Sequence, residues 1–262
     1  MFGLKTAPAH FCRAVTEVIE PVRHLGIDSY FDDISLLHET WPQHIVAIEK
    51  GLDTMGTAGL RFNLRKTEFC KKELLVLGYL VTDEGILPNP TKFKLLRDWP
   101  VPETIKQLRR WIGLATWFKR FLLHFSHKMA PLYDVLKGKE PKFFWGPAQD
   151  EAFARIKSDL VTAPILAPPD HTKPYHVFSD ASGNGIGAIL GQFADDNRLR
   201  TVDMVSRRLS NAETRYTTTE RELLAIVYAL KQWRHLLEGQ KIVCHTDHAP
   251  LCLLKKLKSQ RK

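Results

Sequence analysis

Apolar and polar positions divide the chain into a strand-containing opening, a helical middle and a mixed end, which predicts α+β followed by α/β structure. Apolar residues at helical spacing predict helices over 9–25 and 42–55, with the run "SYFDDISLLH" (29–38) between them. Two strands are expected at "RFNLRKTEF" (61–69) and "LLVLGYLVT" (74–82). Prolines in "GILPNP" (85–90) and "TAPILAPPDHTKP" (162–174) indicate boundaries. We therefore expect three segments, residues 1–88, 89–168 and 169–262.

The middle segment combines helical periodicity with an excess of positive charge. Its strongest amphipathic stretch spans 104–125, and residues 104–142 hold nine basic side chains against two acidic ones. Interleaved aromatic side chains make this pattern typical of a surface that follows a phosphate backbone. The alternative is that the aromatic residues form a core and the lysines only face solvent. The candidate nucleic-acid-binding residues are Lys106, Arg109, Arg110, Lys119 and Arg120.

The last segment is predicted to contain three strands, a long helix, a strand and a helix. Asp180 stands at the end of an alternating strand, whose glycines miss the G-x-G-x-x-G spacing of a dinucleotide site. Glu220 and Glu222 stand at the start of the helix, where capping by the preceding threonines can explain either glutamate. Asp247 ends the later strand, and "HTDH" lacks the helical histidine pair of a zinc site.

These acids can converge at one edge of a mixed sheet. Clustered carboxylates repel one another, and a pair of Mg²⁺ ions relieves that repulsion. Two metal ions about 4 Å apart can activate water and stabilise the leaving oxygen in phosphodiester cleavage.

Asp32 and Asp33 place two negative charges in the aromatic and aliphatic run at 29–38, and these charges need an explanation. In a strand Tyr30 and Asp32 would share one face, with Asp33 on the other. A half-buried carboxylate is costly unless it is paired, hydrogen-bonded or metal-bound. One interpretation is a hairpin turn, although no Gly or Asn follows. The other is a metal site, which needs a partner carboxylate.

Composition narrows the class of partner. The 262 residues are 44% apolar and 26% charged, as in a soluble globular protein, and the net charge of +9 favours a polyanion such as nucleic acid. An anionic membrane is the rival partner. We expect no membrane association, because no apolar run is long enough for a spanning helix and the first residues do not resemble a signal peptide. We expect an intracellular protein, of the cytoplasm or the nucleus.

Seven collinear blocks resemble the reverse transcriptase and ribonuclease H regions of the Pol polyprotein of gypsy-type (Metaviridae) LTR retrotransposons. They are "FGLKTAPAHFCRAV", "YFDDI", "LGYLVTDEGILPNPTK", "WPVPETIKQLRRWIGLATWFKRFL", "FSDASGNGIGAIL", "SRRLSNAETRYTTTERELLAIVYAL" and "TDHAPL". The resemblance implies the C-terminal part of a reverse transcriptase palm (1–88), a thumb and connection (89–168) and a ribonuclease-H-like domain (169–262). "LGYLVT" would be the hairpin that grips the primer end.

The same resemblance implies site residues and chemistry. Asp32 and Asp33 match the Y-x-D-D aspartates that bind Mg²⁺, with Mn²⁺ as the alternative ion, during RNA-directed DNA synthesis. Asp180, Glu222 and Asp247 match ribonuclease H metal ligands, and the glutamate just before "LLAI" favours Glu222 over Glu220. The implied partners are template-primer nucleic acid and an RNA/DNA hybrid, whose RNA strand is hydrolysed.

Departures from the family pattern limit these expectations. A further polymerase aspartate would lie upstream of the first block, and a fourth ribonuclease H aspartate beyond Lys262, so we expect a truncated palm and a C-terminally incomplete nuclease domain. The isolated chain is then expected not to polymerise unless other Pol segments supply the fingers and the first palm aspartate. The alternative is a catalytically silent nucleic-acid-binding remnant or a co-opted host protein.

Overall fold

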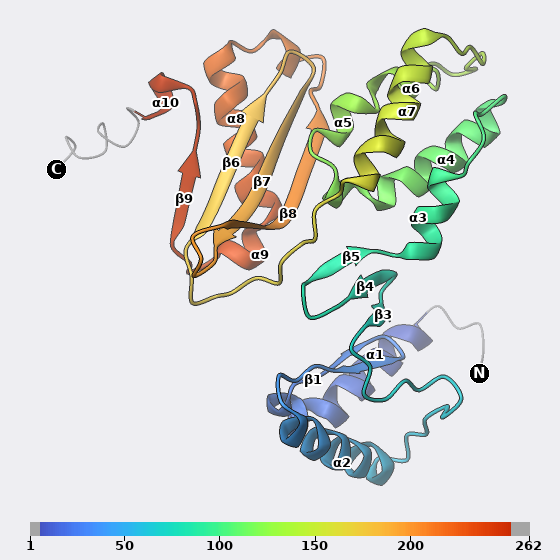
Figure 1. Cartoon of the computed structure of the whole chain (residues 1–262), viewed down its shortest axis with the longest axis vertical. Helices are drawn as coiled ribbons and strands as arrows, with labels where there is room; N and C mark the ends of the chain where they lie inside the picture. Colours follow the sequence, from blue (N-terminus) through green and yellow to red (C-terminus); the bar gives the residue numbers. More distant parts are fainter. Residues whose placement is uncertain (1–5, 253–262) are drawn as a thin grey trace. The chain divides into compact units, whose positions relative to one another are not determined.

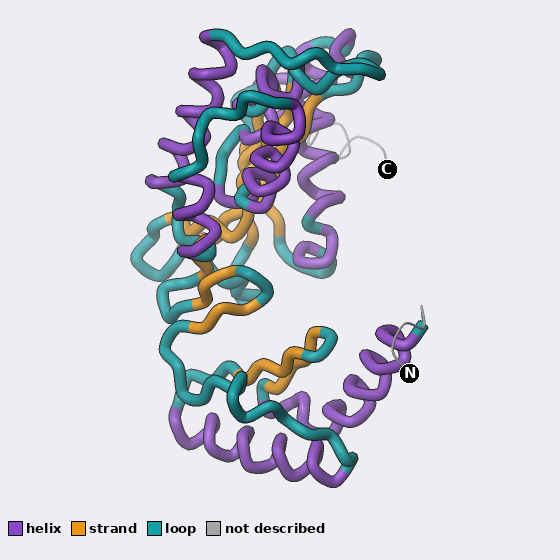
Figure 2. The backbone as a smooth tube through the Cα atoms, turned by 90° about the vertical axis from the view of Figure 1, so that its right-hand side faces the viewer, coloured by secondary structure: helices purple, strands orange, loops and turns teal. Residues whose placement is uncertain are grey.

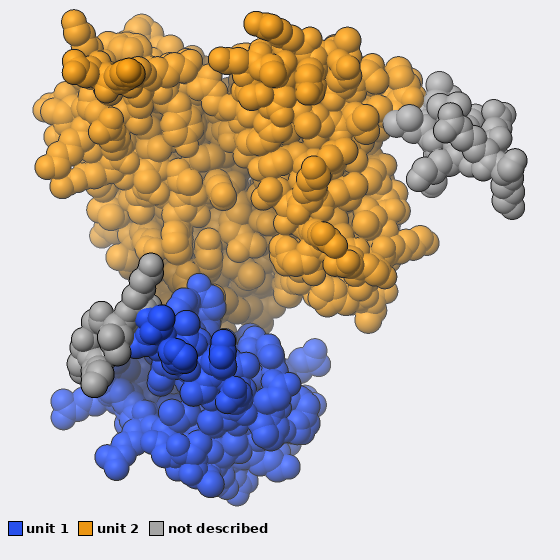
Figure 3. Space-filling view, turned by 180° about the vertical axis from the view of Figure 1, so that it is seen from behind, with its two compact units in different colours: residues 1–70 blue, residues 71–262 orange. Residues whose placement is uncertain are grey.

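The structure is a computed structural model that describes residues 6–252. The chain divides into two compact units, residues 1–70 and 71–262, coloured separately in Figure 3. The sequence placed the first boundary near residue 88 instead. The difference arises because the strands that follow Cys70 pack on the helical segment, where the Tyr79 ring stacks on Trp117 with 5.4 Å between ring centroids.

Unit 1 is a small α+β body of two helices and one hairpin, drawn in purple and orange at the bottom of Figure 2. Its first α-helix ends at Ile19 and continues as a 3₁₀ turn, because Pro21 has no N–H to donate to the preceding turn. Buried aliphatic side chains, including Val15, Ile27 and Met55, form its core. Its elements are α1 (Ala7–Ile19), η1 (Glu20–Leu25), β1 (Ile27–Tyr30), β2 (Asp33–Leu36) and α2 (Trp41–Thr57).

Two strand predictions after α2 were wrong in detail. Residues 61–69 form no strand. The Asn63 side chain accepts a hydrogen bond from the Arg65 N–H, and the backbone carbonyl of Asn63 accepts from the Lys66 N–H, which closes a turn. The predicted single strand at 74–82 is a hairpin of β3 (Leu74–Val76) and β4 (Tyr79–Val81). Its turn residues Leu77 and Gly78 have φ values of 50° and 82°, as a two-residue hairpin turn requires. β5 (Ile86–Pro88) completes a three-stranded antiparallel sheet.

Short helices follow this sheet and share one aromatic-rich core. The amphipathic pattern predicted over 104–125 is helical only to Trp117, after which the chain turns through a 3₁₀ segment. Trp111, Phe118 and Phe121 are buried, so these aromatic side chains belong to the core. The elements are α3 (Pro90–Arg97), α4 (Ile105–Trp117), η2 (Lys119–Phe121), α5 (Phe125–Lys128), α6 (Ala130–Asp134) and α7 (Pro147–Val161).

The rest of unit 2 is a four-stranded mixed sheet in the order β8-β7-β6-β9 (Figure 1). β9 runs parallel to β6, and the other pairs are antiparallel. The long helix α8 covers one face, where Tyr175, Leu190 and Trp233 meet in the core. The η2–α5 segment lies against β8, and the Ser126 N–H donates to Ser206 Oγ at 3.0 Å. The elements are β6 (Tyr175–Ala181), β7 (Gly185–Phe193), β8 (Leu199–Arg208), η3 (Glu213–Arg215), α8 (Thr218–Gln232), α9 (Arg234–Leu237), β9 (Ile242–His245) and α10 (Ala249–Cys252).

The proline-rich stretch predicted as a linker is fastened to both sheets of unit 2. The Ile86 N–H donates to the Leu166 carbonyl at 2.7 Å, and the Ala167 N–H donates to Thr201 at the same distance. The fold class predicted from the sequence, α+β with a mixed α/β sheet domain, is confirmed. Within residues 6–252 no helix combines the length and the apolar character that a membrane crossing requires.

Candidate active site

The start of α8 separates the roles of its two glutamates. Thr217 and Glu220 form a capping box, in which Glu220 Oε2 accepts from the Thr217 N–H at 2.8 Å. The second box that the sequence allowed, Thr219 with Glu222, does not form. Thr219 Oγ1 instead lies 2.7 Å from His248 Nε2, which ties the loop after β9 to this helix. Glu222 therefore takes no part in capping the helix.

The two aspartates lie at the same end of two neighbouring parallel strands. β6 and β9 pair in parallel with Phe178 opposite His245, and Asp180 and Asp247 each come two residues after that pair. Neighbouring strands lie about 4.8 Å apart, so this register brings the two residues to the same end of the sheet. Both residues are exposed, as a substrate site at a sheet edge requires.

Glu222 approaches the same edge from the helix. The residue is only 5% exposed, Oε1 accepts from the Ala181 N–H at 3.3 Å, and Oε2 is buried with no hydrogen-bond partner among the described residues. Burial raises the pKa of this carboxyl, and the charges of Asp180 and Asp247 raise the pKa further, against the lowering effect of the Ala181 N–H. Glu222 is thus close enough to both aspartates to sense their charges.

These acids lie at the same end of the sheet but do not form a closed metal site. Among residues 6–252 no three His, Cys, Asp or Glu side chains are gathered tightly enough to hold one ion as they stand. The unpartnered Glu222 Oε2 nevertheless fits a cation, because a buried carboxylate oxygen lacks the hydrogen bond that it would otherwise need. An all-oxygen donor set also suits a hard divalent ion.

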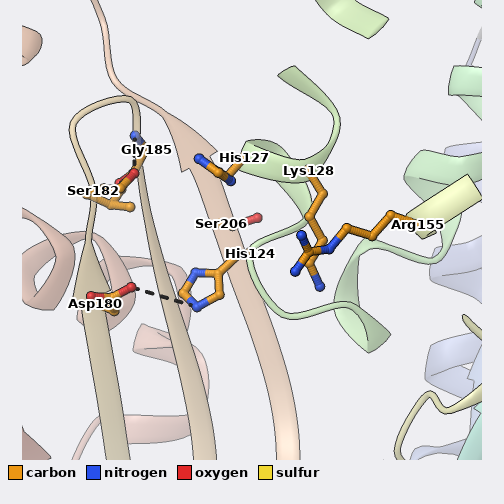
Figure 4. Close-up of a pocket in the computed structure, with 9 residues that line it drawn as sticks. His124, His127, Lys128, Arg155, Asp180, Ser182, Gly185 and Ser206 are labelled. Atoms are coloured by element: carbon orange, nitrogen blue, oxygen red, sulfur yellow. Dashed lines mark hydrogen bonds and ion pairs between the residues drawn. The ribbon is translucent and has the colours of Figure 1, made fainter. Parts of the chain in front are cut away.

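A set of residues that the sequence did not predict lies beside Asp180 (Figure 4). Asp180 pairs with Gly187 across β6 and β7, and Gly187 pairs with Ser206 across β7 and β8, so the three residues form a row on one face of the sheet. His124 covers this row, with Nε2 3.7 Å from Asp180 Oδ2. Burial lowers the pKa of His124, and Asp180 opposes that shift. No local pattern in the sequence indicates a contact between segments so far apart along the chain.

The aspartates of unit 1 lie on a hairpin tip, and the hairpin-turn interpretation describes this geometry. Tyr30 pairs with Asp33, which leaves Phe31 and Asp32 as the two turn residues. The prediction that Tyr30 and Asp32 share a strand face was therefore wrong, because the turn interrupts the alternation. Phe31 has a φ of 56°, an uncommon conformation for a bulky residue. Asp32 and Asp33 are both exposed at this tip.

The predicted nucleic-acid-binding residues divide into two groups. Four of them are exposed, namely Lys106, Arg109 and Arg110 on α4 and Lys119 in η2. Arg120 is committed elsewhere, since its Nε donates to Asp203 Oδ1 at 3.3 Å and its guanidinium lies 5.3 Å from the Tyr79 ring centroid. Asp203 Oδ2 also accepts from Trp233 Nε1 at 3.0 Å. Arg120 thus joins the β3–β4 hairpin to the sheet domain, which distinguishes it from the other four predicted residues.

Two family models match the chain. The model described as "Reverse transcriptase (RNA-dependent DNA polymerase)" matches residues 1–81. The model described as "RNase H-like domain found in reverse transcriptase" matches residues 145–244. The first range contains the hairpin with the two aspartates, and the second contains β6 and α8.

Curated relatives match along nearly the whole chain. The retrovirus-related Pol polyprotein from transposon 297 of Drosophila melanogaster is 34% identical, over 98% of this chain and 24% of the relative. That from transposon opus of the same species is 33% identical, over 95% and 26%. The Tf2-3 transposon polyprotein of Schizosaccharomyces pombe is 31% identical, over 95% and 19%. The chain spans about a quarter of the length of the first two relatives.

Solved structures share the fold. The foamy viral protease-reverse transcriptase solved with double-stranded DNA has a TM-score of 0.85 at 24% identity, over 98% of this chain and 53% of that one. The same viral protein solved with an RNA/DNA hybrid gives 0.83 at 24% identity, over 100% and 36%. Together with the relatives and the two matched domains, this fold places the chain in the reverse transcriptase and ribonuclease H region of the Pol polyproteins of LTR retrotransposons.

Proposed function

We propose that the sheet domain hydrolyses the RNA strand of RNA/DNA hybrids with Asp180, Glu222 and Asp247 as metal ligands. The observation that carries this proposal is the convergence of a buried, unpartnered Glu222 oxygen with two exposed aspartates at the β6–β9 edge. It is supported by the match of residues 145–244 to the RNase H-like domain of reverse transcriptases. Mg²⁺ is the expected ion, with Mn²⁺ as the alternative.

Each acid has a distinct place in this proposal. Asp180 and Asp247 are exposed and would meet the substrate side of the metal site, whereas Glu222 would hold the ions from the protein side. Two divalent ions held there would supply an activated water and stabilise the leaving oxygen of the cleaved phosphodiester. The contact of Thr219 with His248 fixes the loop that carries Asp247, so the chain itself keeps these acids in register.

We propose a second activity for the hairpin of unit 1, RNA-directed DNA synthesis with Asp32 and Asp33 as metal ligands. The match of residues 1–81 to the reverse transcriptase family supports it. Among residues 6–252 no three acids form a closed metal site here, as at the sheet domain, and neither Asp32 nor Asp33 has a buried, unpartnered oxygen of the kind that Glu222 offers. Primer extension is therefore expected only when other Pol segments are added to the purified chain, and extension by the chain alone would contradict this.

Template-primer and hybrid nucleic acid are the proposed partners of the exposed basic residues. Lys106, Arg109 and Arg110 lie within two turns of α4, and no ion pair holds any of them among the described residues. Neutralising phosphates with such side chains makes binding depend on salt, with a slope of about −0.9 per phosphate. Replacing all three by alanine should reduce both the affinity for hybrid and the salt slope.

The test is Mg²⁺- or Mn²⁺-dependent cleavage of a labelled RNA/DNA hybrid by the purified chain. Asp247→Asn should abolish cleavage, because it removes one charged ligand from the proposed metal site. Asp195→Asn, which changes an aspartate whose side chain is 96% exposed in a distant turn, is the matched control and should cleave normally. Soluble protein that binds the hybrid but never cleaves it would favour the silent binding module instead.

A further inference from the structure

Two consecutive residues of α8 hold two consecutive residues at the end of β6. Glu222 Oε1 accepts from the Ala181 N–H at 3.3 Å, and Arg221 Nη1 donates to the Ser182 carbonyl at 3.2 Å. Asp180 directly precedes the two residues that are held. These contacts therefore fasten the strand end that carries one candidate metal ligand to the helix that carries another.

The β6–β7 turn that follows is closed by its own hydrogen bonds. The Ser182 N–H donates to the Gly185 carbonyl at 2.8 Å, and the Gly185 N–H donates to Ser182 Oγ at 3.1 Å. Figure 4 shows Ser182 and Gly185 on this turn, above Asp180. Because the turn is closed internally, a contact at the Ser182 carbonyl determines where the whole turn and the adjoining end of β6 lie.

Arg221 occupies an unfavourable place for a cation. It stands near the start of α8, where the helix dipole disfavours positive charge. Its Nε is buried and has no hydrogen-bond partner within residues 6–252, which is a further cost. Proteins break such local rules chiefly at functional sites. The hydrogen bond from Nη1 goes to a backbone carbonyl, so Arg221 fixes the position of the chain there.

The contact made by Glu222 would compete with metal binding. Its Oε1 accepts from the Ala181 N–H, whereas the same carboxylate would share its charge with divalent ions in the proposed site. The guanidinium of Arg221 stays charged and acts only as a donor. The Arg221 contact is therefore the one that holds the strand end whether or not ions are bound.

We propose that Arg221 is a positioning residue that sets the distance between Asp180 and Glu222 by holding the Ser182 carbonyl. The inference rests on the proposed hydrolase function, and it assigns a residue that acts through the metal ligands. Mg²⁺ demands near-ideal octahedral geometry, whereas Ca²⁺ accepts flexible ligand arrangements. Loosening the β6–β7 turn should therefore weaken the binding of Mg²⁺ more than that of Ca²⁺. A general loss of stability would not separate the two ions.

The experiment compares Arg221→Met, Arg221→Lys and the matched control Lys231→Met in the full chain without nucleic acid. Lys231 is an exposed cation in the last turn of the same helix. Fitting the rise in Tm with the concentration of Mg²⁺ or Ca²⁺ gives the Kd of each ion. Arg221→Met, which keeps the apolar stem but cannot donate, should raise the Kd for Mg²⁺ about tenfold and that for Ca²⁺ by less. Arg221→Lys can still donate to the Ser182 carbonyl and should recover part of the loss, and Lys231→Met should match the unmodified chain.

Hydrogen exchange of the Ser182 and Gly185 amides in EDTA tests the contact without any ion. Both amides should exchange up to about tenfold faster in Arg221→Met, while the β7–β8 ladder keeps its rates and shows that the variant is folded. Should Arg221→Met not fold, the intermediate Kd expected of Arg221→Lys decides in its place.

Two results would overturn the proposal while leaving the hydrolase function in place. One is unchanged exchange at the turn in Arg221→Met, and the other is faster exchange with an unchanged Kd for Mg²⁺. If the unmodified chain itself has no measurable affinity for Mg²⁺, the metal site of the proposed hydrolase fails and the role of Arg221 fails with it.

Discussion

Replacing Glu222 by glutamine should stabilise the metal-free chain and remove its response to Mg²⁺. The carboxylate is buried, and one of its oxygens has no partner among the described residues. Burying the charged carboxylate costs about 1–3 kcal/mol more than burying the neutral amide, which is also unpartnered there, while weakening the hydrogen bond from the Ala181 N–H loses about 0.5–1.5 kcal/mol. The net gain in unfolding free energy at pH 7 in EDTA is therefore about 1 kcal/mol. For a unit of this size that raises the Tm by about 2–4 °C.

Adding Mg²⁺ should make the original chain more stable than the Glu222→Gln variant, the reverse of their order in EDTA. A ligand at ten times its Kd stabilises the folded state by about 1.4 kcal/mol, and the glutamine variant should gain much less. The pH dependence follows from the raised pKa of Glu222: the metal-free chain loses stability as the pH rises through the native pKa. Below the ordinary pKa of glutamate both proteins are uncharged at this position, so their difference should disappear.

Thermal unfolding followed by tryptophan fluorescence reports on unit 2, because five of the six tryptophans lie there. Glu220→Gln is the matched control. It weakens the capping box two residues away and should leave the shift caused by Mg²⁺ unchanged. A Glu222→Gln chain that is less stable than the original in EDTA, or equally stabilised by Mg²⁺, would refute the reasoning.

Three further substitutions test the fold around the sites. Asp203→Asn should lower the unfolding free energy by about 1–2 kcal/mol in a urea titration, because two donors share this half-buried carboxylate; the exposed Asp195→Asn should change it little. Glu213→Gln should destabilise the chain at neutral pH, since a bidentate arginine partner lowers the pKa of this carboxyl to about 2. This loss of stability should shrink as the pH falls from about 4.5 toward 2, because the carboxylate is then protonated. If the substitution acted only through packing, the loss would not change with pH. Phe31→Asn should stabilise unit 1 by about 1 kcal/mol in the same titration, because asparagine tolerates a φ of 56°; Tyr30→Asn, which relieves no strain, should give no gain.

The sequence predicts elements well where local signals agree. The long helix α8 follows from its apolar stripe and from a threonine three residues before Glu220. The strand predicted at 61–69 fails because Asn63 offers the backbone a turn that competes with pairing. A hairpin turn was one of two interpretations of residues 29–38, but turn chemistry did not favour it, since the residue with positive φ is neither Gly nor Asn.

The difference between local signals and tertiary contacts also explains which basic residues could be assigned to an exposed surface. The positive charge of residues 104–142 is visible in composition, and four of the five predicted binding residues are exposed. Arg120 differs because its partner Asp203 comes from β8, far along the chain. Charge clustering shows where positive side chains gather along the sequence, but only tertiary contacts show which of them remain free.

Predicting the candidate nuclease site takes both sequence patterns and tertiary contacts. Asp180 and Asp247 could be grouped from sequence because each ends a strand, and parallel pairing then brings strand ends to one edge. His124 could not be grouped with them, because it reaches Asp180 only when the η2–α5 segment covers β8. Gly187 is the one local trace of that contact, and its missing side chain has meaning only once the imidazole above it is known. Because His124 lies outside the matched range 145–244, the surroundings of Asp180 are completed by residues from beyond the RNase H-like domain. Substitutions in the helical segment should therefore alter the candidate nuclease site directly.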